Sequence, residues 1–262
     1  RVAGASLFRA PTGGVAGELA DRIGGRGPFV SGLAAWGAAF AILAVVIVGL
    51  GVLLTRVVLP AGLGPLDMDV SRWFVERRTP TLNAVTLVGS ELGSTGAIVG
   101  VAVVTAIVLA VKRCWSHLAF LVCALSLEFA VFLTATFIID RARPGVPRLD
   151  PSPVTSSYPS GHAAASLTLY LAIAIVASSF VRSAIARTFV WTVALAVPVV
   201  VAISRVYRGM HHLTDVSVSV LLACGALLFA LLTVRSAVAA SGRRDDAPAC
   251  EPTVDPVLEE AS

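Results

Sequence analysis

Long blocks of apolar residues, separated by shorter polar connectors, dominate the chain. Six blocks approach the roughly 20 residues that a helix needs to cross a membrane. They are approximately Ser31–Leu54, Leu92–Val111, Leu118–Ile139, Gly161–Val181, Thr188–Ser204 and Val216–Val234. They are neither the short strands nor the amphipathic stripes of a soluble fold. We therefore predict an all-α integral membrane bundle of six transmembrane helices.

The two short connectors between these blocks are basic. They are Lys112-Arg113 and the segment from Arg182 to Arg187. Short basic connectors favour the cytoplasmic side of a membrane. We therefore expect a multi-pass protein of the cell membrane with its N-terminus in the cytoplasm and the two long connectors on the non-cytoplasmic side.

The long connectors have compositions of their own. In Pro60–Glu91, Val70, Trp73 and Phe74 follow a helical spacing, which predicts a short interfacial helix that stops near Pro80. Asp140–Ser160 contains five prolines, which predict an irregular and rigid loop.

Composition agrees with a membrane protein. Of the 262 residues, 56% are hydrophobic and only 14% are charged, which is too little charge for the surface of a soluble domain. The formal net charge is +4 and the basic residues are scattered, so we expect no nucleic-acid partner. We expect a cytoplasmic N-terminal segment (1–30), a six-span domain (31–235) and a disordered cytoplasmic tail (236–262).

Three polar clusters stand at the ends of predicted spans, on the side opposite to the short basic connectors. The topology brings all three to one face of the membrane. They are Asp140-Arg141-Ala142-Arg143-Pro144, Tyr158-Pro159-Ser160-Gly161-His162, and the segment from Ser204 to Asp215, which holds Arg205, His211 and His212.

The residue types in these clusters suit phosphate chemistry. Arginine presents a fork of donors that matches phosphate oxygens. Ser160 and Gly161 stand at a helix start, where free N–H groups favour an anion. Two histidines can divide the roles of nucleophile and acid near neutral pH. Asp215 follows His211 by four residues and, in a helical turn, would hold one ring nitrogen of that histidine.

These clusters resemble the three motifs of the type 2 phosphatidic acid phosphatases, KxxxxxxRP, PSGH and SRxxxxxHxxxD. The second motif is complete in Pro159-Ser160-Gly161-His162, and the third in Ser204-Arg205 with His211 and Asp215. Gly89-Ser90 resembles a weaker feature of the family. The resemblance extends from about Ser31 to Val234.

The resemblance implies a mechanism and a site. His211 would attack phosphorus and form a phosphohistidine, Asp215 would orient His211, and His162 would protonate the leaving oxygen. The phosphoryl oxygens would be held by Arg143, Arg205, Ser160 and the Gly161 amide. The resemblance implies no cofactor and no metal.

The first motif departs from the family pattern. The family lysine, seven residues before the arginine of Arg143-Pro144, is replaced by Thr136. Either the site is weakened, or Arg141 supplies the missing charge.

We expect a lipid phosphatase acting on a phosphomonoester or a polyprenyl diphosphate, with membrane lipids as its surroundings. One alternative is a lipid phosphotransferase, and another is a catalytically weak lipid-phosphate-binding protein, because of Thr136. A third, a transporter, rests on Glu128, a carboxylate in the middle of a predicted span that could equally be protonated or bonded to a neighbouring helix. The sequence indicates no oligomeric state.

Overall fold

A computed structural model describes residues 8, 18, 28–151 and 155–240. Within these residues the chain is helical and has no β-strand, which confirms the predicted all-α class. The elements are α2 (Pro28–Leu53), the π-helical segment η3 (Leu54–Leu63), α3 (Gly64–Glu76), α4 (Pro80–Glu91), α5 (Thr95–Val111), α6 (Trp115–Ile138), α7 (Gly161–Ala177), α8 (Ala184–Tyr207) and α9 (Leu213–Ala240).

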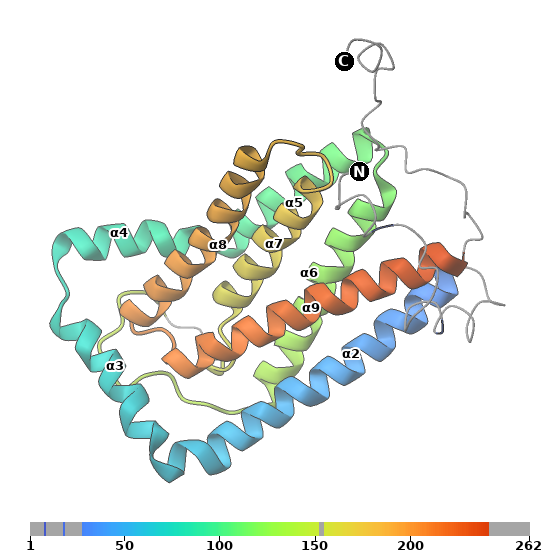
Figure 1. The fold of residues 1–262 in the computed structure, drawn as a ribbon. Coiled ribbons are helices and arrows are strands. Elements are labelled where there is room, and N and C mark those ends of the chain that lie inside the picture. Colours follow the sequence, from blue (N-terminus) through green and yellow to red (C-terminus); the bar gives the residue numbers. More distant parts are fainter. Residues whose placement is uncertain (1–7, 9–17, 19–27, 152–154, 241–262) are drawn as a thin grey trace.

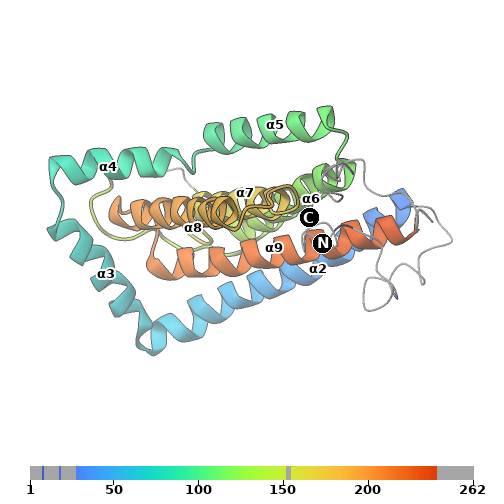
Figure 2. The same cartoon turned by 45° about the horizontal axis from the view of Figure 1, so that its top comes forward.

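The helices form a bundle centred on α6, α7 and α9, which contact one another (Figure 1). Helix α2 packs along α9 and α6, α8 packs on α7, and α4 packs on α8. Fully buried alanines let these helices approach closely, as small residues do in membrane bundles; they include Ala124, Ala135, Ala164, Ala172, Ala226 and Ala230. Helix α3 crosses one end of the bundle and links α2 to α4 (Figure 2).

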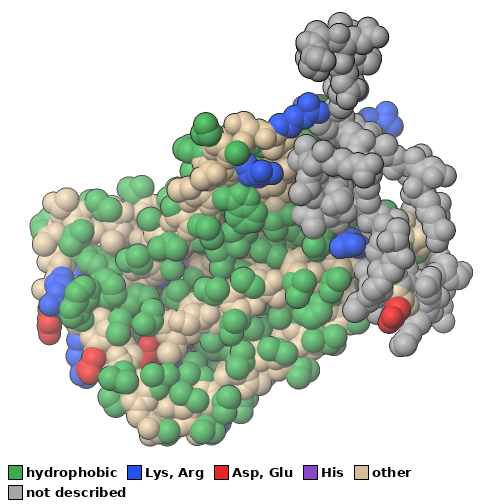
Figure 3. Space-filling view, viewed as in Figure 1, with side chains coloured by type: hydrophobic (Ala, Val, Ile, Leu, Met, Phe, Trp, Pro, Cys, Tyr) green, Lys and Arg blue, Asp and Glu red, His purple; other side chains and the backbone are tan. Residues whose placement is uncertain are grey.

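The outer surface is apolar. On the face shown in Figure 3, hydrophobic side chains cover the middle, and charged side chains gather toward the ends. Large apolar side chains stand exposed on this surface, among them Val104 and Ile107 of α5 and Phe137 of α6. Such a surface is stable only when lipid covers it.

Each of the six predicted apolar blocks falls on a helix, but the count of six spans is not confirmed. Four described stretches are long and apolar enough to cross a membrane, namely Phe29–Glu76 and the helices α6, α8 and α9. Helices α4 and α5 would make a fifth span, bent by 42°. Helix α7 is apolar but has only 17 residues, because the chain before Gly161 belongs to the loop that carries part of the site.

The connector Pro60–Glu91 contains two helices. The predicted short helix is present as α3, which turns Asp67 and Ser71 inward and leaves Trp73 exposed. The break before it lies in η3, where Pro60 lacks a backbone N–H and Gly62 has a φ of 126°. The rest forms α4, capped by the Thr79 hydroxyl, and extends the second apolar block toward the site.

The predicted ends of the domain lie partly outside the described residues. Helix α9 continues through Ala240, so it includes the first residues of the tail that we predicted from Ser236 onward. Residues 241–262 lie outside the described residues, as do nearly all of residues 1–27.

Candidate active site

The structure brings the three polar clusters together at the end of the bundle that α3 crosses (Figure 1). Arg141 and Arg143 follow the end of α6, Ser160 caps the start of α7, and His211 lies in the turn between α8 and α9. Four helix ends therefore supply one site.

The turn that carries His211 has a defined geometry. Helix α8 ends in a Schellman motif, in which the Met210 N–H donates to the Arg205 carbonyl and the Gly209 N–H donates to the Val206 carbonyl, both at 3.0 Å. Gly209 takes the left-handed conformation that this motif requires, with a φ of 73°. The motif fixes where the chain leaves α8 and so where His211 begins.

The two ring nitrogens of His211 face different partners. Nδ1 lies 2.7 Å from the Ser157 carbonyl oxygen, which can only accept a hydrogen bond. Nε2 lies 3.4 Å from Arg143 Nη1, which can only donate one. Both contacts require the tautomer with the proton on Nδ1. The Nε2 lone pair therefore faces the arginine side of the site.

The surroundings of His211 keep its ring neutral. Burial, followed by the charges of Arg205 and Arg143, lowers the pKa of His211 to about 3, although Asp215 acts in the opposite direction. A buried neutral imidazole with an unprotonated Nε2 is the form that can act as a nucleophile.

Asp215 lies beside His211 but does not hold it by the direct hydrogen bond that we expected. The Asp215 Oδ2 is 3.9 Å from His211 Nδ1. This carboxylate accepts instead from the Ser157 hydroxyl and from the His212 backbone N–H, the latter at 2.9 Å. The expectation assumed a helical turn, whereas α9 begins only at Leu213, after both histidines.

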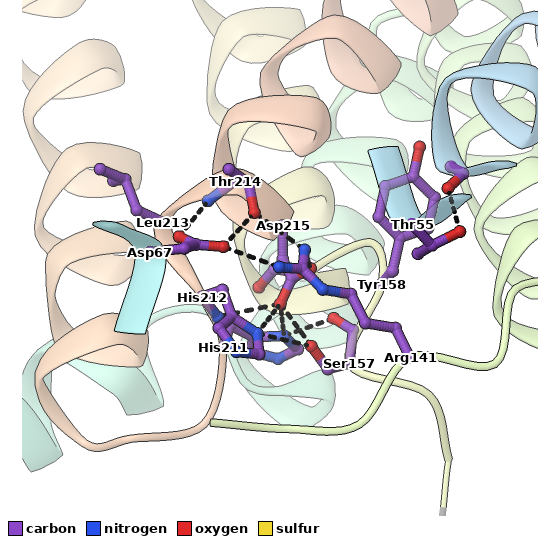
Figure 4. A network of polar contacts seen from close by, with 12 residues as sticks. Thr55, Asp67, Arg141, Ser157, Tyr158, His211, His212, Leu213, Thr214 and Asp215 are labelled. Atoms are coloured by element: carbon purple, nitrogen blue, oxygen red, sulfur yellow. Dashed lines mark hydrogen bonds and ion pairs between the residues drawn. The ribbon is translucent and has the colours of Figure 1, made fainter. Parts of the chain in front are cut away.

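Arg141, the possible substitute for the missing lysine, binds two carboxylates in the structure. It is buried, and its two terminal nitrogens bind two carboxylates, Nη1 that of Asp215 and Nη2 that of Asp67 at 2.7 Å. Figure 4 shows the guanidinium between these groups, with Thr214 completing the network. Because both terminal nitrogens are engaged by carboxylates, the structure favours the other alternative, a site weakened by Thr136.

Three donors from the three motifs are buried without a hydrogen-bond partner among the described residues. They are Arg143 Nε, Ser160 Oγ and Arg205 Nε. Each of these residues was predicted to bind phosphate. An unsatisfied buried donor costs about 1–3 kcal/mol, so three of them near one histidine indicate a site suited to an anion.

The rest of the Arg205 side chain is held in place. Its Nη1 donates to Ser90 Oγ at 2.8 Å and to Asp150 Oδ2 at 3.2 Å. Gly89 allows α4 to approach α8 closely enough for the contact between Ser90 and Arg205, because a Cβ at residue 89 would lie 2.4 Å from Ser204 Oγ. Gly89-Ser90 therefore supports the third motif directly.

His162 lies within the same electrostatic environment. Its ring is close enough to Arg205, Asp150 and Arg143 to be affected by their charges. Asp150 also binds Arg208 through both of its carboxylate oxygens. Burial raises the pKa of the Asp150 carboxyl, but the hydrogen bond and charge of Arg208 and the charge of Arg205 outweigh this effect and leave the pKa below its ordinary value.

The last two predicted positions flank the start of α7. Gly161 is the first residue of α7, and a Cβ there would lie 2.9 Å from the Phe132 ring, so glycine permits close packing of α7 on α6. Thr136 faces the same turn from α6 and donates to the Tyr158 carbonyl at 3.4 Å.

Three residues of the site carry no signal in the sequence that identifies them as site residues. Ser157 binds His211 through its backbone carbonyl, an interaction with no sequence signature. Asp67 had been assigned only to an interfacial helix, and Asp150 only to a proline-rich loop. Both carboxylates, Asp67 buried and Asp150 half-buried, are partners of arginines that the sequence did single out.

Comparison with known proteins agrees with this geometry. The sequence profile of the PAP2 superfamily matches residues 116–238, which include all three clusters. No curated protein matches the chain.

Two solved structures share the fold. One is a transmembrane PAP2-type phosphatidylglycerolphosphate phosphatase from Bacillus subtilis, with a TM-score of 0.59 and 26% identity, covering 76% of this chain and 92% of the other. The other, Aquifex aeolicus LpxE, has a TM-score of 0.52 and 20% identity, covering 63% of this chain and 94% of the other. The profile match over residues 116–238 and the Bacillus subtilis neighbour confirm the resemblance to the PAP2 superfamily that the motifs indicated.

Proposed function

We propose that this protein is a lipid phosphate phosphatase that forms a phosphohistidine on His211. The observation that carries the proposal is that Arg143, Ser160 and Arg205, one from each motif, have buried donors without a partner among the described residues, and that Arg143 also contacts Nε2 of His211. These donors suit the oxygens of a phosphoryl group, and Nε2 suits attack on its phosphorus.

The first step transfers the phosphoryl group to the enzyme. His211 Nε2 forms a bond to phosphorus while the bond from phosphorus to the leaving oxygen breaks. The arginines bind the charge that develops on the phosphoryl oxygens. The phosphorylated ring keeps its Nδ1 proton and donates it in a hydrogen bond to the Ser157 carbonyl, and the carboxylate of Asp215 favours the positive charge on the ring.

His162 would serve as the acid and then the base. A bound phosphate dianion adds negative charge beside its ring, which favours the protonated imidazole needed to protonate the leaving oxygen. The neutral imidazole then takes a proton from water as the water oxygen attacks phosphorus. The bond from phosphorus to Nε2 breaks, and inorganic phosphate and free His211 result.

The substrate would present its phosphate at the membrane surface and keep its chain in lipid. Phosphatidylglycerophosphate is the first candidate, because the Bacillus subtilis neighbour is named for that lipid. Phosphatidate and polyprenyl diphosphates carry the same reacting group. The arginine, serine and histidine donors would bind these phosphates directly, so we propose hydrolysis that needs no metal, at the non-cytoplasmic surface.

The test is release of inorganic phosphate by purified protein in detergent from a panel of these three lipids. We expect release from at least one lipid, undiminished by a chelator, and a loss of at least a thousandfold in His211→Ala. His117→Ala is the control, because His117 lies apart from the site, near Phe8 and Phe180. No release from any lipid, or a His211→Ala enzyme within tenfold of wild type, would contradict the proposal. Transfer to an alcohol without free phosphate would favour the phosphotransferase.

A further inference from the structure

The network at the start of α9 contains a carboxylate that the proposed reaction does not use. Asp67 of α3 has a buried side chain, and its Oδ2 accepts from Arg141 Nη2 at 2.7 Å and from Thr214 Oγ1 at 2.5 Å. Its Oδ1 accepts from the Thr214 backbone N–H at 3.2 Å. Figure 4 shows Asp67 and Asp215 on either side of the Arg141 guanidinium.

These contacts give Asp67 an indirect path to His211. Arg141 binds Asp67 with one terminal nitrogen and Asp215 with the other. Asp215 Oδ2 is in turn 3.9 Å from His211 Nδ1. The orientation of the carboxylate beside the nucleophile therefore depends on a guanidinium that Asp67 helps to hold.

The net charge of the network also indicates a role for Asp67. Two carboxylates and one guanidinium leave one net negative charge. Asp215 and Arg141 alone would be neutral as a pair. Since the His211 ring becomes positively charged when Nε2 bonds phosphorus, a net negative unit next to it stabilises that state, and a neutral one does not.

We propose that Asp67 is a positioning residue for phosphoryl transfer, which through Arg141 fixes Asp215 beside His211 and keeps the unit next to the ring negatively charged. The inference rests on the proposed function of the site. The competing explanation is that Asp67 only fastens α3 to the end of the bundle.

Helix α3 offers a matched control. Asp69 lies two residues from Asp67 on the same helix, but its side chain is 62% exposed and, within the part of the chain that the structure describes, pairs with the exposed Arg72 at 3.0 Å. Asp67→Asn and Asp69→Asn therefore remove the same charge from the same helix, inside and outside the network.

The first measurement separates kcat from KM, per unit of folded enzyme. We expect Asp67→Asn to lower kcat at least tenfold, which is ~1.4 kcal/mol in the barrier, with KM within threefold of wild type. Asp67→Glu, which retains the charge, should recover part of the loss, and Asp69→Asn should match wild type. A kcat within threefold of wild type, or an effect on KM alone, overturns the inference. Asp67→Ser replaces Asp67→Asn if the latter does not fold, and failure of both to fold supports the fastening role instead.

The second measurement needs no lipid phosphate. Diethyl pyrocarbonate acylates a neutral histidine nitrogen and, like phosphorylation, builds positive charge on the ring. We expect Asp67→Asn to slow the acylation of His211, followed by peptide mass spectrometry, at least threefold, and Asp69→Asn to leave it unchanged. If the substitution only loosened the network, His211 would become more exposed and its acylation would be faster. Faster acylation in Asp67→Asn, or no acylation of His211 in wild type, overturns the inference. If the wild-type protein releases no phosphate but Asp67→Asn still slows the acylation of His211, the proposed function fails and the inference about Asp67 stands.

Discussion

At the scale of single residues, the arrangement around His211 depends on which groups can donate and which can accept. The Ser157 carbonyl at Nδ1 can only accept and the Arg143 guanidinium at Nε2 can only donate, so both contacts are satisfied by one tautomer of His211, with its proton on Nδ1. His212, its neighbour, is also engaged, because its Nδ1 lies 3.3 Å from Asp215 Oδ2. An alanine at His212 would therefore remove a partner of Asp215. His117, which lies apart from the site, is therefore the better control.

The protonation state of His211 is a direct prediction. Its pKa of about 3, against an ordinary 6.5, means that the ring should stay neutral with its proton on Nδ1 from about pH 5 to pH 8. An unfolded chain binds a proton here as the pH falls below 6.5, whereas the folded chain does not until about pH 3. The contribution of this residue to stability is therefore complete above 6.5 and is lost as the pH falls toward 3.

Nitrogen-15 spectra of histidine-labelled protein, assigned by His211→Gln, measure this state. A His211 signal that titrates near 6.5, or that shows a proton on Nε2, would contradict both the tautomer and the assignment of His211 as nucleophile.

Thr136 provides a second prediction at this scale. The engagement of Arg141 by two carboxylates favours the alternative that nothing replaces the lysine of the first motif. We therefore expect Thr136→Lys to raise kcat/KM toward simple lipid phosphates about tenfold, since a charge-assisted hydrogen bond is typically worth about 1.5–3 kcal/mol.

The control is Thr134→Lys, two residues earlier on α6, where the native hydroxyl donates to the Ala130 carbonyl within the same helix. Equal rates for wild type and Thr136→Lys would show that the site does not need the lysine.

At the scale of the elements, close approach between helices determines the shape of the site. Gly89 of α4 packs directly on α8, and a Cβ would meet Ser204 Oγ at 2.4 Å and Val200 Cγ1 at 2.9 Å. Ser90, the next residue, holds Arg205. Separating α4 from α8 would therefore change both packing and phosphate binding.

We expect Gly89→Ala to destabilise the protein by roughly 1–3 kcal/mol, as overpacking does, and to lower kcat/KM at least tenfold. Gly96→Ala is the matched control, because a Cβ at Gly96 of α5 meets nothing within 4 Å. It should be neutral or slightly stabilising, since alanine favours a helix more than glycine does. Thermal unfolding in detergent and phosphate release measure both effects, and equal behaviour of the two variants would refute this account of Gly89.

At the scale of the whole molecule, the open question of topology can be tested without any activity. The loop with Thr155 and the turn before α8 lie at opposite ends of the bundle (Figure 1). With Cys114, Cys123, Cys224 and Cys250 replaced, we expect Thr155→Cys to react with an impermeant thiol reagent in intact cells. Ala184→Cys should react only after lysis. Both positions are exposed in the structure, and the reverse labelling pattern would place the site in the cytoplasm.

Much of this molecule was predictable because its signals are local. Each apolar block became a helix, since a lipid environment requires backbone hydrogen bonds to be satisfied within the segment. Gly209 ends α8 for a reason of backbone geometry that acts within a few residues. The sequence did not predict an element that depends on packing. Helix α4 is the example, because we assigned its residues to a connector, whereas in the structure it packs against α8.

The sequence by itself predicted the fold class, the family resemblance and the candidate site residues, because apolar length, motif spacing and residue type are properties of short stretches of chain. Only the tertiary structure decided which partner each of those residues binds. It assigned Arg141 to two carboxylates, gave His211 a backbone carbonyl, and brought Asp67 and Asp150 to the arginines. Such partners lie 54 to 74 positions apart in sequence. Their pairing depends on how charges and donors are satisfied once helices from four parts of the chain meet at one buried end.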